Sequence, residues 1–412
     1  MMGTLIRYEL KKILGNRAGM AACALAFGVL LLFSVLNLVT ASVRDFETGQ
    51  TKTGIEAQQC LESEIESYAG PITDERIAQA EDELATAHRL AGSVPGFDDL
   101  SSEQIIERYG LEFWQDTLGT MNQQFLISLQ GVMGFDSKAG SFKYASLEEG
   151  VDEALEQQLR SGFAGEKPYS DAEKEYWREK EAQVEWPLQY GYANGWANSL
   201  NCLMAYMGLA IAALCIVVSG VFAGEYQRGT AAVVLPTRRG KKALPMAKAI
   251  AAMVFASVFW WLCVGMVLAV NIGICGADGA DLPLQIVGYT IPYGVGMAQT
   301  VVSIALLGYL IVLGMAGATL LLSSVVHSTM PAAVAPLCVV FLGLMGLFLA
   351  PVVKLAALTP ASALNYSFSR MLSYAVGPAV LDLPTAATVL YCVLLVVSVP
   401  FAIRAFRRHQ MA

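Results

Sequence analysis

Long runs without charge are the feature that most constrains this chain of 412 residues. No Asp, Glu, Lys or Arg occurs between Asp281 and Lys354, and shorter charge-free runs follow Arg17, Glu185 and Lys248. A helix of about 20 apolar residues crosses the hydrocarbon core of a bilayer. Only 15% of the residues are charged, whereas soluble proteins carry about 25%. The sequence therefore predicts an all-α polytopic membrane protein.

The positions of the apolar runs predict six transmembrane helices. A polar break at 323–331 divides the longest run into two of them. Glycines and Pro292 within 282–297 predict that the fourth span is entered through an irregular or re-entrant segment instead of a regular helix. The expected spans are 18–42, 198–222, 246–275, 297–322, 332–353 and 385–403, so that helices 2 to 6 occupy 198–403.

Residues 1–17 precede the first span and carry a basic, amphipathic pattern. Ile6, Leu10 and Ile13 recur at helical spacing beside Arg7 and Lys11, which favours a helix at the cytoplasmic interface over the frayed start of the span. The run 18–42 exceeds the roughly 7 to 15 apolar residues of a signal peptide. We therefore expect an uncleaved anchor, and cleavage after Ala41 is the alternative.

Residues 43–197 form an acidic domain between the first two spans. They contain 30 Asp or Glu against 12 Lys or Arg, a net charge of −18, whereas the rest of the chain has a net charge of +10. Apolar residues three or four apart predict surface helices near 74–90 and 147–159, and 170–186 predicts a solvated helix. The domain is thus expected to be mostly helical.

Basic residues predict the orientation in the membrane. The N-terminus, the connection 224–248 and the tail 404–412 contain 13 Lys or Arg, while the short opposite loops contain only Lys354 and Arg370. By the positive-inside rule both termini are cytoplasmic and 43–197 is extracytoplasmic, in the bacterial cell (inner) membrane. Basic residues placed between spans do not form the exposed groove that a nucleic-acid partner needs.

We find no catalytic, cofactor or metal site in the sequence. The nearest approach to a phosphate-binding loop is 240–242, where Lys242 replaces the required Ser or Thr. His88, His327 and His409 are too scattered for a zinc site, and seven of eight cysteines lie in or beside apolar spans. We interpret His327 as a loop histidine that faces cytoplasmic water. The alternative is that its titration has a functional role.

Energy for transport must then come from outside the chain. The spans contain no Asp or Glu that would hold a coupling ion, which argues against a secondary carrier. The largest cytoplasmic connection begins Gly224-Glu225-Tyr226-Gln227-Arg228-Gly229-Thr230. This segment resembles permeases of the type-two ABC exporter family, in which Gly-Glu-Tyr-x-x-Gly-Thr closes the second span before a coupling helix. The basic amphipathic N-terminus, the large external domain between the first two spans and the count of six spans also match this family.

The resemblance implies that residues 225–240 dock in a separate cytoplasmic ABC ATPase, which would bind ATP and Mg. It also implies a second permease copy or a homologous permease. Glu225 and Arg228 lie three apart on one helix face and can pair with each other or with the partner, and Thr230 can cap a following helix. The ATPase-coupling candidates are Gly224, Glu225, Tyr226, Arg228, Gly229, Thr230, Pro236, Arg238 and Arg239.

Two other interpretations of the sequence remain. The basic connection can simply bind anionic membrane lipid through Arg238, Arg239, Lys241 and Lys242, although this gives Glu225 no role. The chain can be a membrane-anchored sensor or scaffold, although this leaves the spans unexplained. We favour an exporter that moves an antimicrobial peptide, drug or lipid-like substrate outward. Its path candidates, which equally serve helix packing, are Asn201, Tyr206, Ser219, Asn271 and Ser303.

Overall fold

The computed structural model has two compact units built almost entirely from helices. The structure describes residues 2–162, 168–230, 243–346 and 352–408. The first unit comprises 1–34, 199–270 and 301–412, and the second comprises 35–198 and 271–300.

Five helices in the described residues are long and apolar enough to cross a membrane. The shortest has 20 residues, which at 1.5 Å per residue gives about the 30 Å of a bilayer core. These helices confirm an all-α polytopic membrane protein. They are α2 (Arg17–Val39), α11 (Gly208–Gln227), α13 (Ala243–Cys275), α14 (Met297–Val325) and α18 (Leu383–Arg408).

The expected second and fifth spans differ from the helices observed. The run 198–222 is divided between α10 (Asn194–Tyr206) and α11, with Met207 between them. The division coincides with close packing, because a Cβ on Gly208 would lie 3.0 Å from Cβ of Ala361. For 332–353, the structure has α15 (Thr329–Gly346), whose apolar part is shorter than a span, and residues 347–351 are outside the described residues. The count of six spans stays a prediction.

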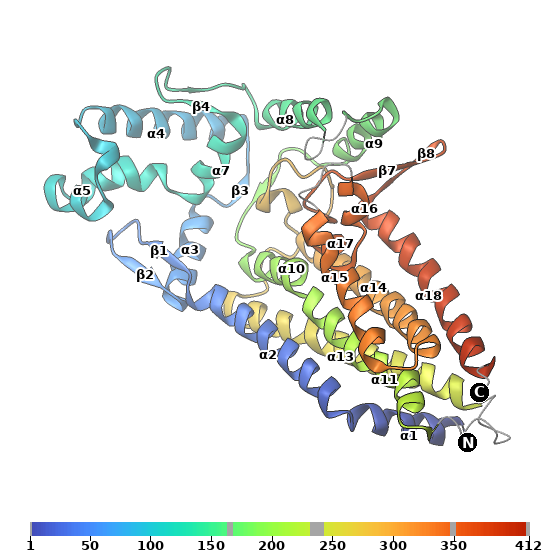
Figure 1. The fold of residues 1–412 in the computed structure, drawn as a ribbon. Helices are drawn as coiled ribbons and strands as arrows, with labels where there is room; N and C mark the ends of the chain where they lie inside the picture. The colour runs from blue at the N-terminus through green and yellow to red at the C-terminus, as the bar shows by residue number, and fades with distance from the viewer. Residues whose placement is uncertain (1, 163–167, 231–242, 347–351, 409–412) are drawn as a thin grey trace. The chain divides into compact units, whose positions relative to one another are not determined.

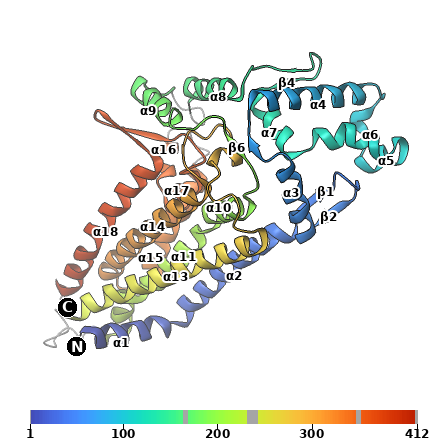
Figure 2. The same ribbon diagram turned by 180° about the vertical axis from the view of Figure 1, so that it is seen from behind.

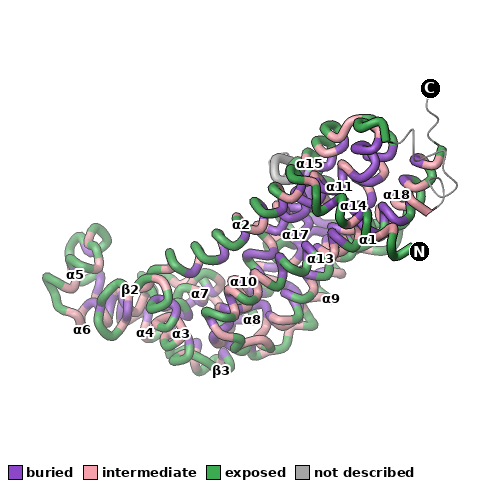
Figure 3. Tube along the Cα trace, turned by 90° about the horizontal axis from the view of Figure 1, so that it is seen from below, coloured by how far each residue is buried: buried purple, intermediate pink, exposed green. Residues whose placement is uncertain are grey.

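Helix α11 lies at the centre of the first unit. Its apolar window is 78% buried, compared with 28% for α2 and 22% for α18, and Figure 3 shows α2 as largely exposed. Helices α13 and α14 are joined where Nε1 of Trp260 donates to the carbonyl of Ala305 at 3.1 Å. An apolar helix that is exposed within one chain needs lipid or another protein around it, so α2 and α18 form the periphery.

Shorter elements complete the first unit (Figures 1 and 2). The amphipathic N-terminal segment forms a helix that buries Glu9 and Ile13, while its interfacial position stays a prediction. Only residues 326–328 separate α14 from α15, a shorter break than the expected 323–331. The elements are α1 (Met2–Leu14), α16 (Val353–Ala357), α17 (Pro360–Tyr366) and the antiparallel pair β7 (Ser373–Val376) and β8 (Ala379–Asp382).

The second unit holds most of the acidic region as short helices, and Ala91, Phe97, Ile105 and Trp114 form one of its buried apolar clusters. Ser and Thr side chains cap several helices, as expected for solvated helices. The helices are α3 (Ile55–Ser67), α4 (Asp74–Gly92), η1 (Phe97–Asp99), α5 (Ser102–Tyr109), α6 (Leu111–Trp114), a π-helical turn (Gln115–Gly119), α7 (Gln124–Met133), α8 (Leu147–Ser161) and α9 (Asp171–Glu181).

Three two-stranded antiparallel sheets and one irregular segment complete this unit. The pair β3–β6 joins the two ends of the helical region, and residues 282–297 contain only the short 3-10 helix η3 (Leu284–Val287) before α14. The segment is therefore irregular, and whether it re-enters the bilayer stays a prediction. The pairs are β1 (Ser42–Arg44) with β2 (Thr51–Thr53), β3 (Gly70–Pro71) with β6 (Gln189–Tyr190), and β4 (Phe135–Asp136) with β5 (Ser141–Phe142).

Candidate functional site

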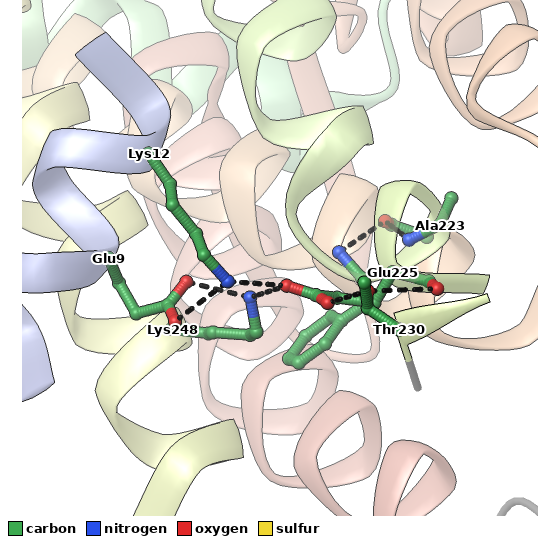
Figure 4. Close-up of polar contacts among 8 residues, drawn as sticks. Glu9, Lys12, Ala223, Glu225, Thr230 and Lys248 are labelled. Atoms are coloured by element: carbon green, nitrogen blue, oxygen red, sulfur yellow. Dashed lines mark hydrogen bonds and ion pairs between the residues drawn. The ribbon is translucent and has the colours of Figure 1, made fainter. Parts of the chain in front are cut away.

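Four charged side chains from three helices of the first unit meet where α11 ends (Figure 4). Nζ of Lys248, in α13, lies 2.7 Å from Oε2 of Glu9 in α1 and 2.8 Å from Oε1 of Glu225 in α11. Nζ of Lys12 lies 2.9 Å from the same Oε1 of Glu225 and 3.6 Å from Oε1 of Glu9. We call these four residues the charge cluster. Its two cations and two carboxylates balance.

The charge cluster is largely removed from solvent. The side chains of Lys248, Glu9 and Glu225 are 2%, 4% and 10% exposed, whereas Lys12 is 37% exposed. Burying a charge costs several kcal/mol unless a partner compensates it, so each member depends on the others. Partial burial lowers the pKa of Lys12, but the hydrogen bond to Glu225 and the charges of Glu9 and Glu225 outweigh it and raise that pKa above its ordinary value.

The end of α11 is shaped by the residues that follow Glu225. Gly229 has φ +69°, the left-handed conformation that commonly ends a helix and that glycine adopts without steric cost. The Thr230 hydroxyl turns back to hydrogen-bond the Glu225 carboxylate. Gly224 needs no such explanation, because a Cβ there would meet only a Thr329 methyl at 4.0 Å.

Neutral contacts fix the same end of α11 on its other side. The hydroxyl of Tyr226 donates to the carbonyl of Ser324 at 3.1 Å, and its ring packs 5.6 Å from that of Phe406 in α18. Oγ of Ser323 accepts from the amides of Phe222 and Ala223 at 3.1 and 2.9 Å. The last turn of α11 is thus held by α1, α13, α14 and α18 together.

A cavity of about 320 Å³ lies beside the charge cluster. All four members of the cluster line it, together with Ser219 and the exposed Arg228. The cavity is large enough for a few waters or one small group.

The structure changes the role expected for Glu225. The sequence suggested that it pairs with Arg228 or with a partner protein, but Glu225 faces inward and pairs with Lys12 and Lys248. In the described part of the chain, Arg228 forms no ion pair. The remaining coupling candidates Pro236, Arg238 and Arg239, with Lys241 and Lys242, are outside the described residues.

Sequence reasoning missed Glu9 and Lys248 as site residues. Lys248 was counted only among the basic residues that set orientation, yet it lies within the third span helix, α13. The sequence could have indicated Glu9 as a site residue, because Glu9 and Glu225 are two of only five acidic residues outside 43–197. Acidic residues that rare, each beside a predicted span, indicate a specific partner.

The candidate path residues do not converge on the cavity beside the charge cluster. Only Ser219 lines it, and the Ser219 hydroxyl donates to the carbonyl of Ile216 in its own helix at 2.8 Å. Tyr206 stacks on Phe33 with ring centroids 4.5 Å apart, which is a packing contact between helices. Asn201 is exposed and Ser303 half-buried in the first unit, while Asn271 belongs to the second.

The comparisons with known proteins cover the membrane region and the acidic region together. The sequence model of a family described as "ABC-2 family transporter protein" matches residues 5–411. No curated protein and no solved structure gives a match. The matched range includes the charge cluster and all five apolar span helices.

Proposed function

The chain belongs to the ABC-2 transporter family, and we propose that it is the membrane-spanning permease subunit of an exporter driven by a separate ABC ATPase. It moves a hydrophobic or amphipathic substrate outward, and ATP with Mg binds to the partner ATPase. A second copy of this chain or a homologous permease completes the path. Both termini and the connection after α11 face the cytoplasm.

The charge cluster is the observation that carries this proposal. The cytoplasmic connection between α11 and α13 begins three residues after Glu225 and ends six residues before Lys248. Glu225 and Lys248 are themselves an ion pair at 2.8 Å. Both ends of the connection are therefore tied to each other and, through Glu9, to α1.

Because the charge cluster fixes both ends of the connection, a displacement of the connection by the ATPase moves the helices at its ends. A loop that can slide at its ends would absorb the displacement produced by a partner, whereas a loop fixed at both ends passes it to α11 and α13. Since α11 is the most buried span, its displacement changes the packing of the whole first unit. Glu225 thus acts as a positioning residue, and contact with the ATPase falls to residues beyond Gly229.

The experiment is reconstitution of the chain with a candidate ABC ATPase of the same organism, in lipid nanodiscs and in proteoliposomes. We expect the two proteins to copurify in mild detergent and substrate to stimulate ATP hydrolysis. Glu225→Gln keeps the size of the side chain and its contact with Thr230 but removes the charge shared by Lys12 and Lys248. It should reduce the substrate transported per ATP severalfold while hydrolysis continues.

Lys11→Gln is the matched control, because it removes one exposed charge from α1 that lies outside the charge cluster and the lining of its cavity. It should leave the coupling ratio near that of the wild type. If Glu225→Gln folds poorly, Lys12→Met tests the charge cluster through its most exposed member. A chain that purifies alone and never stimulates an ATPase would contradict the proposal and favour a sensor or scaffold.

A further inference from the structure

The cavity beside the charge cluster has more cations than carboxylates in its wall. The positive residues of its described lining are Lys12, Lys248 and Arg228, and the negative ones are Glu9 and Glu225. Both carboxylates are matched within the charge cluster, because Lys248 contacts each of them and Lys12 contacts Glu225 (Figure 4). Arg228 forms no ion pair within the described ranges. The lining therefore carries one positive charge that no described residue neutralises.

Asn16 adds a hydrogen-bond donor to the same wall. Its Oδ1 accepts from the amide of Gly19 at 3.3 Å, which distinguishes the oxygen of the side chain from its nitrogen. Nδ2 lies 3.0 Å from the position of a Cβ on Gly19 and 3.7 Å from that of a Cβ on Gly220, and both glycines line the cavity. Asn16 is half-buried, and its Nδ2 is neither completely enclosed nor bonded to a described residue. A donor without an acceptor thus lies at the cavity wall.

Three further side chains of the lining have N–H groups to offer. Oε1 of Gln227 accepts from the hydroxyl of Thr329 at 3.0 Å, which leaves Nε2 as a donor. The Lys12 ammonium has three N–H donors, and at most two of them serve the carboxylates of the charge cluster. The guanidinium of Arg228 has five. The complement of these donors is a negatively charged group with several acceptor oxygens, and a phosphate is such a group.

We infer that this cavity binds a phosphate group, whose oxygens accept from Asn16, Lys12 and Arg228. The volume of about 320 Å³ holds the phosphate together with part of the molecule that carries it. The lining reaches the surface, because Arg228 is exposed and the apolar Met330 is 74% exposed. A phospholipid headgroup and free inorganic phosphate share this chemistry. The inference goes beyond the proposed function and does not rest on it, because phosphate binding requires neither an ATPase nor transport.

The test uses the full chain, purified and freed of lipid in a maltoside detergent, which contains no phosphate. Native mass spectrometry compares the retention of phosphatidylglycerol with that of diacylglycerol bearing the same acyl chains. Thermal unfolding compares inorganic phosphate with chloride at equal ionic strength. A preference of at least severalfold for phosphatidylglycerol identifies a lipid as the ligand, and stabilisation by inorganic phosphate identifies the free anion. The absence of both effects would overturn the inference.

Arg228→Gln removes the unpaired cation of the lining. It should weaken the binding of the phosphate-bearing ligand about fivefold, because a partly solvated ionic contact contributes about that much. Lys11→Gln is the matched control, because Lys11 is an exposed cation outside the lining, and it should leave the affinity within about twofold of the wild type. Equal weakening by the two variants would show only a general attraction of anions to a basic surface, and would overturn the inference.

Asn16→Asp tests the amide donor separately. The Asp side chain keeps an oxygen that accepts from the Gly19 amide, but it replaces Nδ2 with a carboxylate oxygen that repels phosphate. We expect the affinity to fall by about tenfold or more, while Asn16→Ala, which removes the donor without adding a charge, should weaken binding only a few-fold. Wild-type affinity in an Asn16→Asp chain that unfolds at the wild-type temperature would contradict the inference.

Discussion

The ion pairs formed by helical residues differ in burial between the two units of this protein. In the first unit, the charge cluster places Lys248 and Glu9 at 2% and 4% exposure with balanced charges. In the second unit, pairs such as Arg178 with Glu156 and Arg160 with Glu153 have side chains that are 33% to 64% exposed. The buried contacts determine where helices lie, while the exposed ones leave their helices dependent on apolar packing.

The difference follows from solvation. Water already stabilises an exposed charge, so its pairing adds little and is screened by salt. A charge taken out of water has lost that stabilisation, and only its partners replace it. The first unit can therefore use a few charges to fix positions, whereas the second carries many charges that keep it solvated and repel one another.

The largest destabilisation is expected from Lys248→Met. It leaves Glu9 and Glu225 facing each other in a buried site with only the half-exposed Lys12, so we expect a loss of about 3 to 5 kcal/mol in the free energy of unfolding. Thermal unfolding of the chain in nanodiscs, followed by tryptophan fluorescence, measures the effect. The double variant Lys248→Met and Glu9→Gln removes one charge of each sign and should recover part of the loss. A single variant as stable as the wild type would show that the cluster is solvated after all.

A smaller loss is expected from Ser323→Ala, which removes a neutral contact at the same end of α11. The Ser323 hydroxyl is fully buried, donates to the carbonyl of Ser219 at 2.6 Å and accepts from two amides of α11. Loss of these bonds should cost about 1 to 2 kcal/mol, since helix amides retain their own acceptors. Ser324→Ala, in the next position, is the control, because its hydroxyl donates only within α14. Equal losses from both variants would contradict this account.

The span helices were predictable because their cause is local. Twenty consecutive apolar residues cannot be solvated by water, wherever they lie in the chain, and this predicted α2, α13, α14 and α18 to within a few residues. The amphipathic helices α4 and α8 follow from spacing for the same reason. The division at Met207 was not predictable from the continuous apolar run 198–222, and it coincides with the approach of Ala361, distant in sequence, to Gly208.

The candidate site was predictable only in part. The motif around Glu225 contains one member of the charge cluster, and Gly229 has the left-handed conformation that commonly ends a helix, while the coupling role of the motif stays a prediction. The inward direction of Glu225 was not predictable, because it depends on Lys248 and Glu9, which lie 23 and more than 200 positions away. A sequence pattern shows which residues share a helix face, but not which other helix that face meets.

A pH-dependent effect is expected from Glu181→Gln in the second unit. Burial, followed by the charge and hydrogen bond of Asp152, raises the pKa of Glu181 from 4.5 to about 7. The folded state then binds more protons than the unfolded state between these values, so stability falls as pH rises from about 4.5 to 7 and stays reduced above. Gln mimics the protonated form and should stabilise α9 at pH 8.5 by somewhat under 1 kcal/mol after solvent screening, with no gain at pH 5. Hydrogen exchange of α9 amides measures this, and an equal gain at both pH values would contradict it.

The smallest effect is expected from Arg178→Gln, which removes the exposed partner of Glu156. The pair is close, with Nε 2.6 Å from Oε1, and it lowers the pKa of Glu156. Both side chains remain in contact with water, so a short distance here does not imply a large energy. We expect the melting temperature to change by no more than about 2 °C at 0.15 M salt and less at 1 M. Glu153→Gln, which removes the partner of Arg160, is the control and should behave alike. A loss as large as that from Lys248→Met would show that exposed pairs also fix the second unit, and the contrast between the two units would fail.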